Sequence, residues 1–266
     1  MSGFPACWLA MREPYDRAAR SAAVLDAVAA AFAGASTAAV TDLGCGTGAT
    51  MRAIAPRLPA RQSWRLIDND EALLEAARRA APAGTNVTTV AVDLACAIEQ
   101  TLGSCDLVAT SALLDLVSAA WIDRLVAYLA RMSRPLYAAL SYDGVVTLTP
   151  ETRHDEAVIA AVNCHQRTDK GFGPALGPAA ARTAPERFSR AGFAVIAGRS
   201  DWRFGPDDRE IQMEMLAGWA VAAGEIGVDP SILEEWLHER RNHLAAGRSQ
   251  MRVGHIDFFA TPMGRR

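Results

Sequence analysis

The sequence predicts an α/β fold in which a mostly parallel sheet carries helices on both faces. Short apolar runs alternate with segments of helical spacing between residues 38 and 142. The first run leads into a turn with glycines at alternate positions, and the first three runs each reach an aspartate where they end. Alternating strands and helices require crossover connections that cover both faces of a sheet, and ligands then bind at the carboxyl ends of its strands.

Five strands and four helices are expected in this region. The expected strands are 40–43, 64–67, 87–92, 106–110 and 136–141, and the helices begin near residues 49, 70, 95 and 119. The preceding segment is expected to be helical, with a break at Pro14 and a second helix that runs to about Ala33.

The turn after the first strand reads Asp42-Leu43-Gly44-Cys45-Gly46-Thr47-Gly48. Glycines let the backbone bend sharply and approach a ligand where a Cβ would collide. Gly44, Gly46 and Ala49 also fit the dinucleotide fingerprint G-x-G-x-x-A. The acid at Asp42 favours a different ligand, because a carboxylate suits an ammonium group and sits awkwardly beside a pyrophosphate.

Acids also end the next two runs. Asp68, followed by Asn69, lies about where a ribose diol would be held. Asp93, followed by Leu94, ends the third run, and the fourth run exits through Thr110 and Ser111. Since all of these positions fall at the carboxyl ends of strands, we expect them to meet at one edge of the sheet.

Taken together, these motifs resemble the class I S-adenosylmethionine-dependent methyltransferases over roughly residues 38 to 142. The resemblance implies a Rossmann-like, seven-stranded sheet whose last two strands, about 193–199 and 253–260, form an antiparallel pair. It implies S-adenosylmethionine as the cofactor, with Asp93 near the adenine amino group. It also implies an N-terminal segment folded over the cofactor, in which Arg12, Tyr15 and Arg20 are candidates to reach the cofactor's carboxylate or the substrate. The cofactor-binding residues expected from it are Asp42, Gly44, Gly46, Gly48, Asp68, Asn69, Asp93, Leu94, Thr110, Ser111 and Arg12.

One methyltransferase domain is expected to span residues 1–266. Within it we expect an N-terminal helical cap (1–36), a cofactor-binding core (37–142), a substrate-side insertion or lid (143–180) and a C-terminal part with the last two strands (181–266). Additions of this kind usually build substrate recognition on a common fold, so a small-molecule pocket is expected.

The expected reaction is methylation of a small-molecule acceptor at oxygen, nitrogen or carbon. A hydroxyl or ammonium acceptor needs a general base, for which His165, Tyr142 and Asp115 are the candidates. A carboxylate acceptor would need no base. The exit of the fourth run lacks an Asn or Asp followed by Pro-Pro and an aromatic residue, which argues against methylation of DNA bases.

Composition excludes other classes. The net charge is −3, the basic residues are spread along the chain, and no apolar run approaches the roughly 18 residues that cross a membrane. The five cysteines are scattered without a C-x-x-C pair, so neither a disulfide framework nor a metal site is expected. We therefore expect a cytoplasmic protein whose partners are a small-molecule substrate and, as a candidate assembly, a second copy in a homodimer, with no nucleic acid and no membrane.

Two alternative functions stay open. An NAD(P)-dependent oxidoreductase would use the same glycine turn, although no Tyr-x-x-x-Lys set is evident. A catalytically silent S-adenosylmethionine-binding protein would share the whole first half of the sequence.

Overall fold

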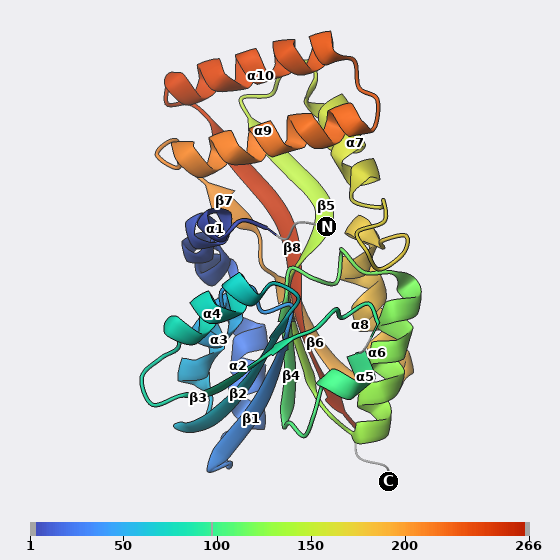
Figure 1. Cartoon of the computed structure of the whole chain (residues 1–266). Coiled ribbons are helices and arrows are strands. Elements are labelled where there is room, and N and C mark those ends of the chain that lie inside the picture. Colours follow the sequence, from blue (N-terminus) through green and yellow to red (C-terminus); the bar gives the residue numbers. More distant parts are fainter. Residues whose placement is uncertain (1–3, 97, 264–266) are drawn as a thin grey trace.

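The computed structural model describes residues 4–96 and 98–263, and in this part of the chain eight strands form one sheet (Figure 1). The strand order is β3-β2-β1-β4-β5-β8-β6, with β7 paired to β8. Strands β1 to β5 pair in parallel, whereas β8 runs antiparallel to β5, β6 and β7. The strands are β1 Thr37–Leu43, β2 Arg61–Asp68, β3 Asn86–Ala91, β4 Leu107–Ser111, β5 Leu136–Thr149, β6 Phe193–Arg199, β7 Trp202–Phe204 and β8 Gln250–Pro262.

The expected mostly parallel sheet is therefore confirmed, as is the antiparallel pairing of the strands expected at 193–199 and 253–260. The short strand β7 adds an eighth strand to the seven that were expected. The strand β7 is only three residues long and lies between polar loops. It is too short to show the alternation of apolar and polar residues that predicts a strand.

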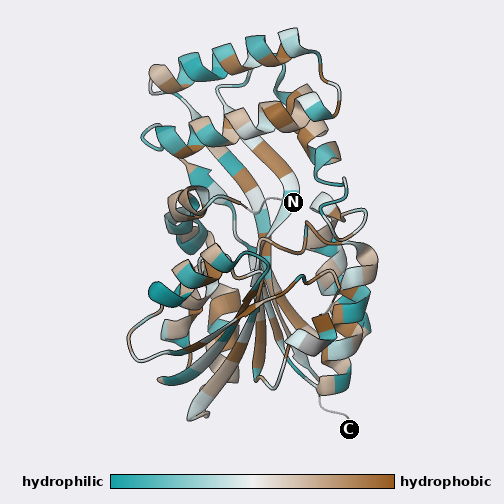
Figure 2. Ribbon diagram, viewed as in Figure 1, coloured by the Kyte–Doolittle hydropathy of each residue, from teal (hydrophilic) through white to brown (hydrophobic). Residues whose placement is uncertain are grey.

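Helices cover both faces of the core sheet. One apolar cluster joins the sheet to α2 (Ala22–Ala31), α3 (Ala49–Ile54) and α4 (Glu71–Arg79). A second cluster, on the other face, joins it to α5 (Ile98–Thr101), α6 (Ala119–Met132) and α8 (Ala180–Arg190). Figure 2 shows hydrophobic residues concentrated in the central strands, as expected for the part of a parallel sheet that is buried on both faces, whereas the edge strand β3 is largely exposed.

The first helix, α1 (Ala6–Ala19), runs without interruption through Pro14, so the break expected there is wrong. Proline inside a helix removes one hydrogen bond and costs about 3 kcal/mol or more. Tertiary contacts on both sides of it hold the helix together: Glu13 is bonded by Arg52, and the Tyr15 hydroxyl donates to Asp208. The chain turns after Ala19 instead.

Strand β5 also continues past Ser141, where it was expected to end, and reaches Thr149. Its second half pairs with the start of β8 after register shifts, and β7 completes a three-stranded extension of the sheet. The helices α7 (Asp155–His165), α9 (Arg209–Glu225) and α10 (Pro230–Ala245) pack against one face of this extension and form a third apolar cluster (Figure 1). We call these three helices the helical cap.

A buried ion pair ties the cap to the end of β5. Arg240 of α10 is fully buried and donates to both carboxylate oxygens of Asp155 at the start of α7 and to the carbonyl of Pro150. The Trp236 indole donates to the same carboxylate at 2.8 Å. Because the charges are paired and hydrogen-bonded, their burial is tolerated and the position of α7 is fixed.

Candidate functional site

The glycine turn lies between β1 and α3 and follows a left-handed backbone path at each of its three glycines. Gly44, Gly46 and Gly48 all have positive φ angles, of 64°, 52° and 83°. A Cβ on Gly46 would lie 3.2 Å from the Leu9 side chain of α1, and one on Gly44 would lie 3.5 Å from Leu113. Only glycine fits this path without strain, and α1 and the β4–α6 loop close over it.

Asp68, at the end of β2, accepts hydrogen bonds that fix the backbone of the glycine turn. Its Oδ2 accepts a hydrogen bond from the Gly46 amide at 2.8 Å, and its Oδ1 accepts one from the Asp70 amide at 3.1 Å. A carboxylate has about four acceptor positions, so this one retains capacity for two hydroxyl donors.

Asp42, near the end of β1, is the most unusual group in the molecule. Its side chain is fully buried, and neither carboxylate oxygen has a hydrogen-bond partner among the described residues. Burial raises its pKa to about 8, although the positive charge of Arg20 lowers it and the negative charge of Asp68 raises it further. An unpartnered buried carboxyl is costly, and a cationic group placed beside it would remove that cost.

Arg20 reaches the same region from the segment between α1 and α2. Its side chain is buried, and it donates to the Tyr137 hydroxyl at 2.9 Å and to Ser111 Oγ at 3.3 Å. Its Nε has no partner among the described residues and is therefore available to an anionic group. Arg12 lies earlier in the chain, within α1. It donates a hydrogen bond to Asp16 at 3.0 Å, and its guanidinium group lies over the Trp202 ring.

The remaining residues expected around the cofactor lie at the same edge of the sheet in different settings. Asn69 is exposed, and the exposed Asp93 accepts from the Ala95 amide at 2.9 Å. Leu94 is buried, with its carbonyl bonded to the Trp121 indole. The Thr110 hydroxyl donates to the carbonyl of Leu43, so it joins β4 to β1 beside the turn.

Asp115 lies beyond the end of β4, on the side of the site that faces the helical cap. Its side chain is buried and its Oδ1 has no partner among the described residues. Burial raises its pKa to about 6, against the opposing effects of backbone amides and of the Arg12 charge. Ala112, three residues earlier, has a φ of 51°, a strained conformation for a residue with a Cβ.

Tyr142 and His255 lie on neighbouring strands in the same region. The Tyr142 hydroxyl donates to Asn163 of α7 at 2.7 Å, and its ring lies 6.0 Å from the His255 ring. His255 also packs against Trp202, with ring centroids 4.7 Å apart. Burial and the nearby Arg12 charge lower the pKa of His255 to about 3, so its imidazole is neutral.

The structure does not bring His165 to these groups. It lies at the end of α7, where its ring contacts Glu225 of α9 at 2.8 Å and the ammonium group of Lys170. Of the three candidate bases, Asp115 and Tyr142 lie near each other, since the Tyr142 backbone amide acts on the Asp115 carboxyl, whereas His165 lies apart from them beside Glu225.

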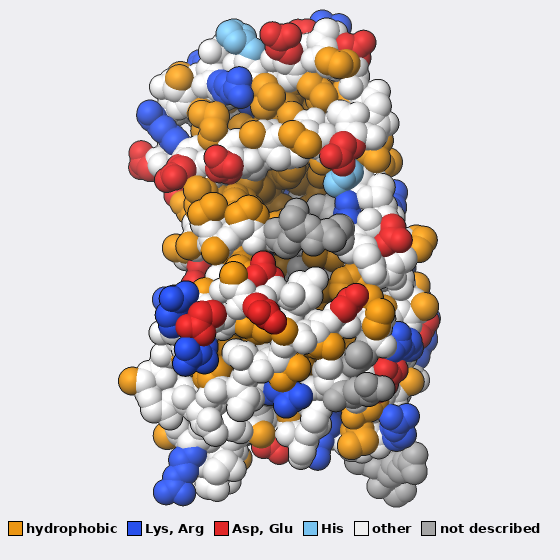
Figure 3. Space-filling model, in the orientation of Figure 1, with side chains coloured by type: hydrophobic (Ala, Val, Ile, Leu, Met, Phe, Trp, Pro, Cys, Tyr) orange, Lys and Arg blue, Asp and Glu red, His pale blue; other side chains and the backbone are white. Residues whose placement is uncertain are grey.

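The surface over this region is hollowed between α9 and the core, and hydrophobic side chains gather along the hollow (Figure 3). Trp8 and Met11 of α1 and Trp219 of α9 are partly buried against the apolar cluster of the cap. Apolar side chains with a few polar groups beside them are typical of small-molecule sites.

Several of these residues were not among the expected site residues. Asn163 and Trp202 carry no local motif, and His255 looks like any packed residue on a strand. Arg20 was expected, with Arg12 and Tyr15, to reach the cofactor's carboxylate or the substrate, but its burial, which a sequence does not display, is what distinguishes it from the exposed arginines. They enter the site because α1, α7 and β7 converge on it in three dimensions.

A family model described as a methyltransferase domain matches residues 40–136. Among solved structures, a putative methyltransferase from Bacillus halodurans has 16% identity, covers 91% of this chain and 100% of its own, and gives a TM-score of 0.52. A SAM-dependent methyltransferase from Thiobacillus denitrificans, in complex with S-adenosyl-L-homocysteine, has 17% identity with coverage of 98% and 100% and a TM-score of 0.47. No curated protein sequence matches significantly.

Proposed function

We propose that this chain is a class I S-adenosylmethionine-dependent methyltransferase that transfers a methyl group from S-adenosylmethionine to a small-molecule acceptor, as its methyltransferase-domain match over residues 40–136 supports. The observation that carries the proposal is the buried Asp42 carboxyl, whose two oxygens lack partners beside a turn of three positive-φ glycines. An ammonium group is the natural partner for that carboxyl, and the cofactor has one.

The other polar groups fit the rest of the cofactor. The free acceptor positions of Asp68 suit a ribose diol, and the exposed Asp93 and Asn69 lie on the side where the adenine would extend. Arg20, with its unpartnered Nε, is our candidate for the carboxylate of the methionine part. Arg12 is less available because it is bonded to Asp16.

Bound S-adenosylmethionine would supply an electrophilic methyl group on its sulfonium. The protein must then align the acceptor, exclude water and, for a hydroxyl or ammonium acceptor, remove a proton. We assign the proton acceptor to Asp115, whose raised pKa of about 6 still leaves it ionised at neutral pH. Tyr142, held by Asn163, would orient the acceptor, and α1 and the cap would exclude water.

Oxygen, nitrogen and carbon acceptors all remain within this proposal. The insertion, with α7 and the loop after it, supports a specialised pocket because α7 supplies Asn163 and borders the hollow. In the described part of the chain, no helix is long and apolar enough to cross a membrane, and the five cysteines are free.

The alternative of an NAD(P)-dependent oxidoreductase is less favoured by Asp42, because a pyrophosphate would bring negative charge toward a buried carboxyl with no partner. A catalytically silent protein that binds S-adenosylmethionine can be distinguished from an enzyme only by measuring turnover of an acceptor.

Thermal unfolding with S-adenosylmethionine, S-adenosylhomocysteine and NAD(H) tests the proposal. A ligand at a hundred times its Kd adds about 2.7 kcal/mol, which raises Tm by a few degrees. We expect the sulfur nucleosides to raise Tm, Asp68→Ala to abolish the shift, and Asp26→Ala, on the exposed side of α2, to retain it. A shift with NAD(H) alone contradicts the proposal. Release of S-adenosylhomocysteine with members of a panel of small acceptors then distinguishes an enzyme from a silent protein.

A further inference from the structure

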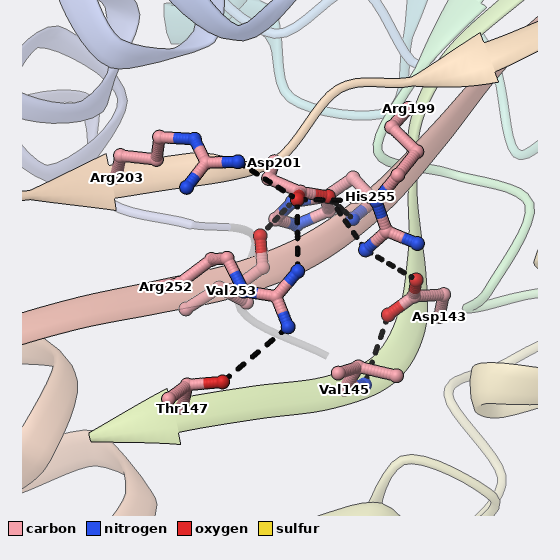
Figure 4. Close-up of polar contacts among 9 residues, drawn as sticks. All are labelled: Asp143, Val145, Thr147, Arg199, Asp201, Arg203, Arg252, Val253 and His255. Atoms are coloured by element: carbon pink, nitrogen blue, oxygen red, sulfur yellow. Dashed lines mark hydrogen bonds and ion pairs between the residues drawn. The ribbon is translucent and has the colours of Figure 1, made fainter.

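A cluster of arginines lies on the sheet extension, on the face opposite the helical cap. Tyr142 and His255 point toward the cap, so the alternation along β5 and β8 turns Asp143 and Arg252 to the other face. Arg199 at the end of β6 and Arg203 of β7 join them there (Figure 4).

Three guanidinium groups in this cluster share one carboxylate. Asp201 accepts from Arg199 at 2.9 Å and from Arg252 at 3.2 Å, and Arg203 lies 3.7 Å from it. Burial would raise the pKa of Asp201, but the bonds from Arg199, the His255 amide and Arg252 hold it below its usual value. Asp201 is therefore an ionised counter-charge that draws the three cations together.

In this cluster the two carboxylates are largely buried, and the guanidinium groups of Arg199 and Arg203 are exposed to solvent. The side chains of Asp201 and Asp143 are 4% and 12% exposed, whereas those of Arg199 and Arg203 are 52% and 74% exposed. Three guanidinium groups against these two carboxylates leave one excess positive charge in a chain whose net charge is −3. Solvent, and any ligand, meets the positive side.

These arginines border a real hollow. A cavity of about 320 Å³ is lined by Tyr15, Ala18 and Ala19 of α1 on one side and by Arg199, Asp201 and Arg203 on the other. The Tyr15 hydroxyl is engaged by Asp208, and its ring packs edge-on against Phe204, so its position is fixed. One wall is thus apolar and aromatic, and the opposite wall carries guanidinium donors.

We propose that this cavity binds a small molecule with an oxyanion group and an apolar body, such as an organic carboxylate or a phosphate ester. The oxyanion accepts hydrogen bonds from Arg199 and Arg203, whose planar donors match such groups, while the apolar body packs on Tyr15 and the alanines. The same helix α1 also lies over the glycine turn, where its Leu9 side chain lies beside Gly46, so a molecule bound against Tyr15 and the alanines helps to hold α1 in place.

Titration of protein labelled with ¹⁵N in the arginine side chains tests this site directly. Benzoate, acetate and inorganic phosphate are added at constant ionic strength, and the Nε–Hε signals are followed. We expect benzoate to shift the Arg199 and Arg203 signals saturably and to bind more tightly than acetate, because only benzoate uses the apolar wall. Saturable phosphate binding at these signals with no benzoate response would instead identify a phosphate as the ligand.

Two variants decide the outcome. Arg203→Gln leaves Asp201 paired with Arg199 and Arg252, so folding is preserved, and we expect it to weaken binding about tenfold or more. Arg182→Gln, an exposed arginine of α8, should bind as the wild type does. Equal binding by wild type and Arg203→Gln, or the same shifts with chloride, would overturn the proposal. The thermal shift with S-adenosylmethionine should persist in Arg203→Gln, so failure of this site and failure of the proposed function are separable.

Discussion

Glu13 of α1 receives two hydrogen bonds from Arg52 of α3, at 2.7 and 2.6 Å, and Arg52 donates a third to the carbonyl of Thr47 inside the glycine turn. A bidentate ion pair therefore links the first helix to the glycine turn. The side chains of Glu13 and Arg52 are each only 17% exposed. The bonds to Arg52 lower the pKa of Glu13. This pair controls how closely α1 lies over the site.

Glu13→Gln should loosen α1 over the glycine turn. Loss of the ionic partner costs about 1 kcal/mol, which raises the local opening equilibrium roughly fivefold. Hydrogen–deuterium exchange of residues 6–19 measures this opening. Glu75→Gln, which breaks an exposed pair with Arg78, is the matched control and should leave that exchange unchanged. Unchanged exchange in Glu13→Gln would show that packing alone holds the helix.

Cofactor binding should release a proton from Asp42. The pKa of Asp42 is about 8 in the folded protein, above its ordinary value of 3.8, so between those pH values the folded protein holds this proton while the unfolded chain does not. An ammonium ligand needs the carboxylate, so affinity should rise by up to about tenfold per pH unit from pH 6 toward 8. Calorimetric titration of S-adenosylhomocysteine in buffers of different ionisation enthalpy counts the proton.

Asp42→Asn provides the contrast for that experiment. The amide cannot titrate, so proton release and the rise of affinity with pH should both disappear. The stability of the wild type relative to Asp42→Asn should also fall as pH rises from about 4 to 8, because only the unfolded wild type gives up the proton in that window. Undiminished proton release from the variant would assign the titration to another group.

Asp115 should set the acid limb of the rate profile once an acceptor is found. With a hydroxyl or ammonium acceptor, kcat/KM should fall as pH drops through about 6, since a protonated Asp115 cannot accept a proton. Asp115→Asn should lower kcat about a hundredfold or more and remove that limb. His165→Gln is the comparison and should keep both the rate and the profile. A carboxylate acceptor would show no such limb and no loss in Asp115→Asn.

Asp155→Ala should destabilise the protein by about 3–5 kcal/mol, because it leaves the fully buried Arg240 without its ionic partner. Urea unfolding measures the change in the free energy of unfolding. Glu234→Ala, an exposed position on the same helix as Arg240, should change it by less than about 0.5 kcal/mol. Equal midpoints for the two variants would mean that the cap does not depend on this pair.

Local chemistry in the sequence determined the core sheet and the cofactor side of the site. Glycines at alternate positions require positive φ angles, and Gly44, Gly46 and Gly48 have them; an aspartate at a strand end must lie at the carboxyl edge of a parallel sheet, as Asp42 and Asp68 do. These constraints act over a few neighbouring residues, so they can be recognised in the amino-acid sequence. The apolar runs near 193–199 and 253–260 likewise predicted two strands, which the structure pairs antiparallel as β6 and β8.

Tertiary structure alone decided the acceptor side and the arginine-lined cavity. The continuation of β5 past Ser141, the strand β7 and the uninterrupted α1 all depend on partners that are distant in the sequence, and local propensity does not encode such partners. Burial made Asp42 and Asp115 chemically distinct from the exposed acids around them. A carboxyl acquires a shifted pKa from what surrounds it in space, which is why only the fold could single these two out.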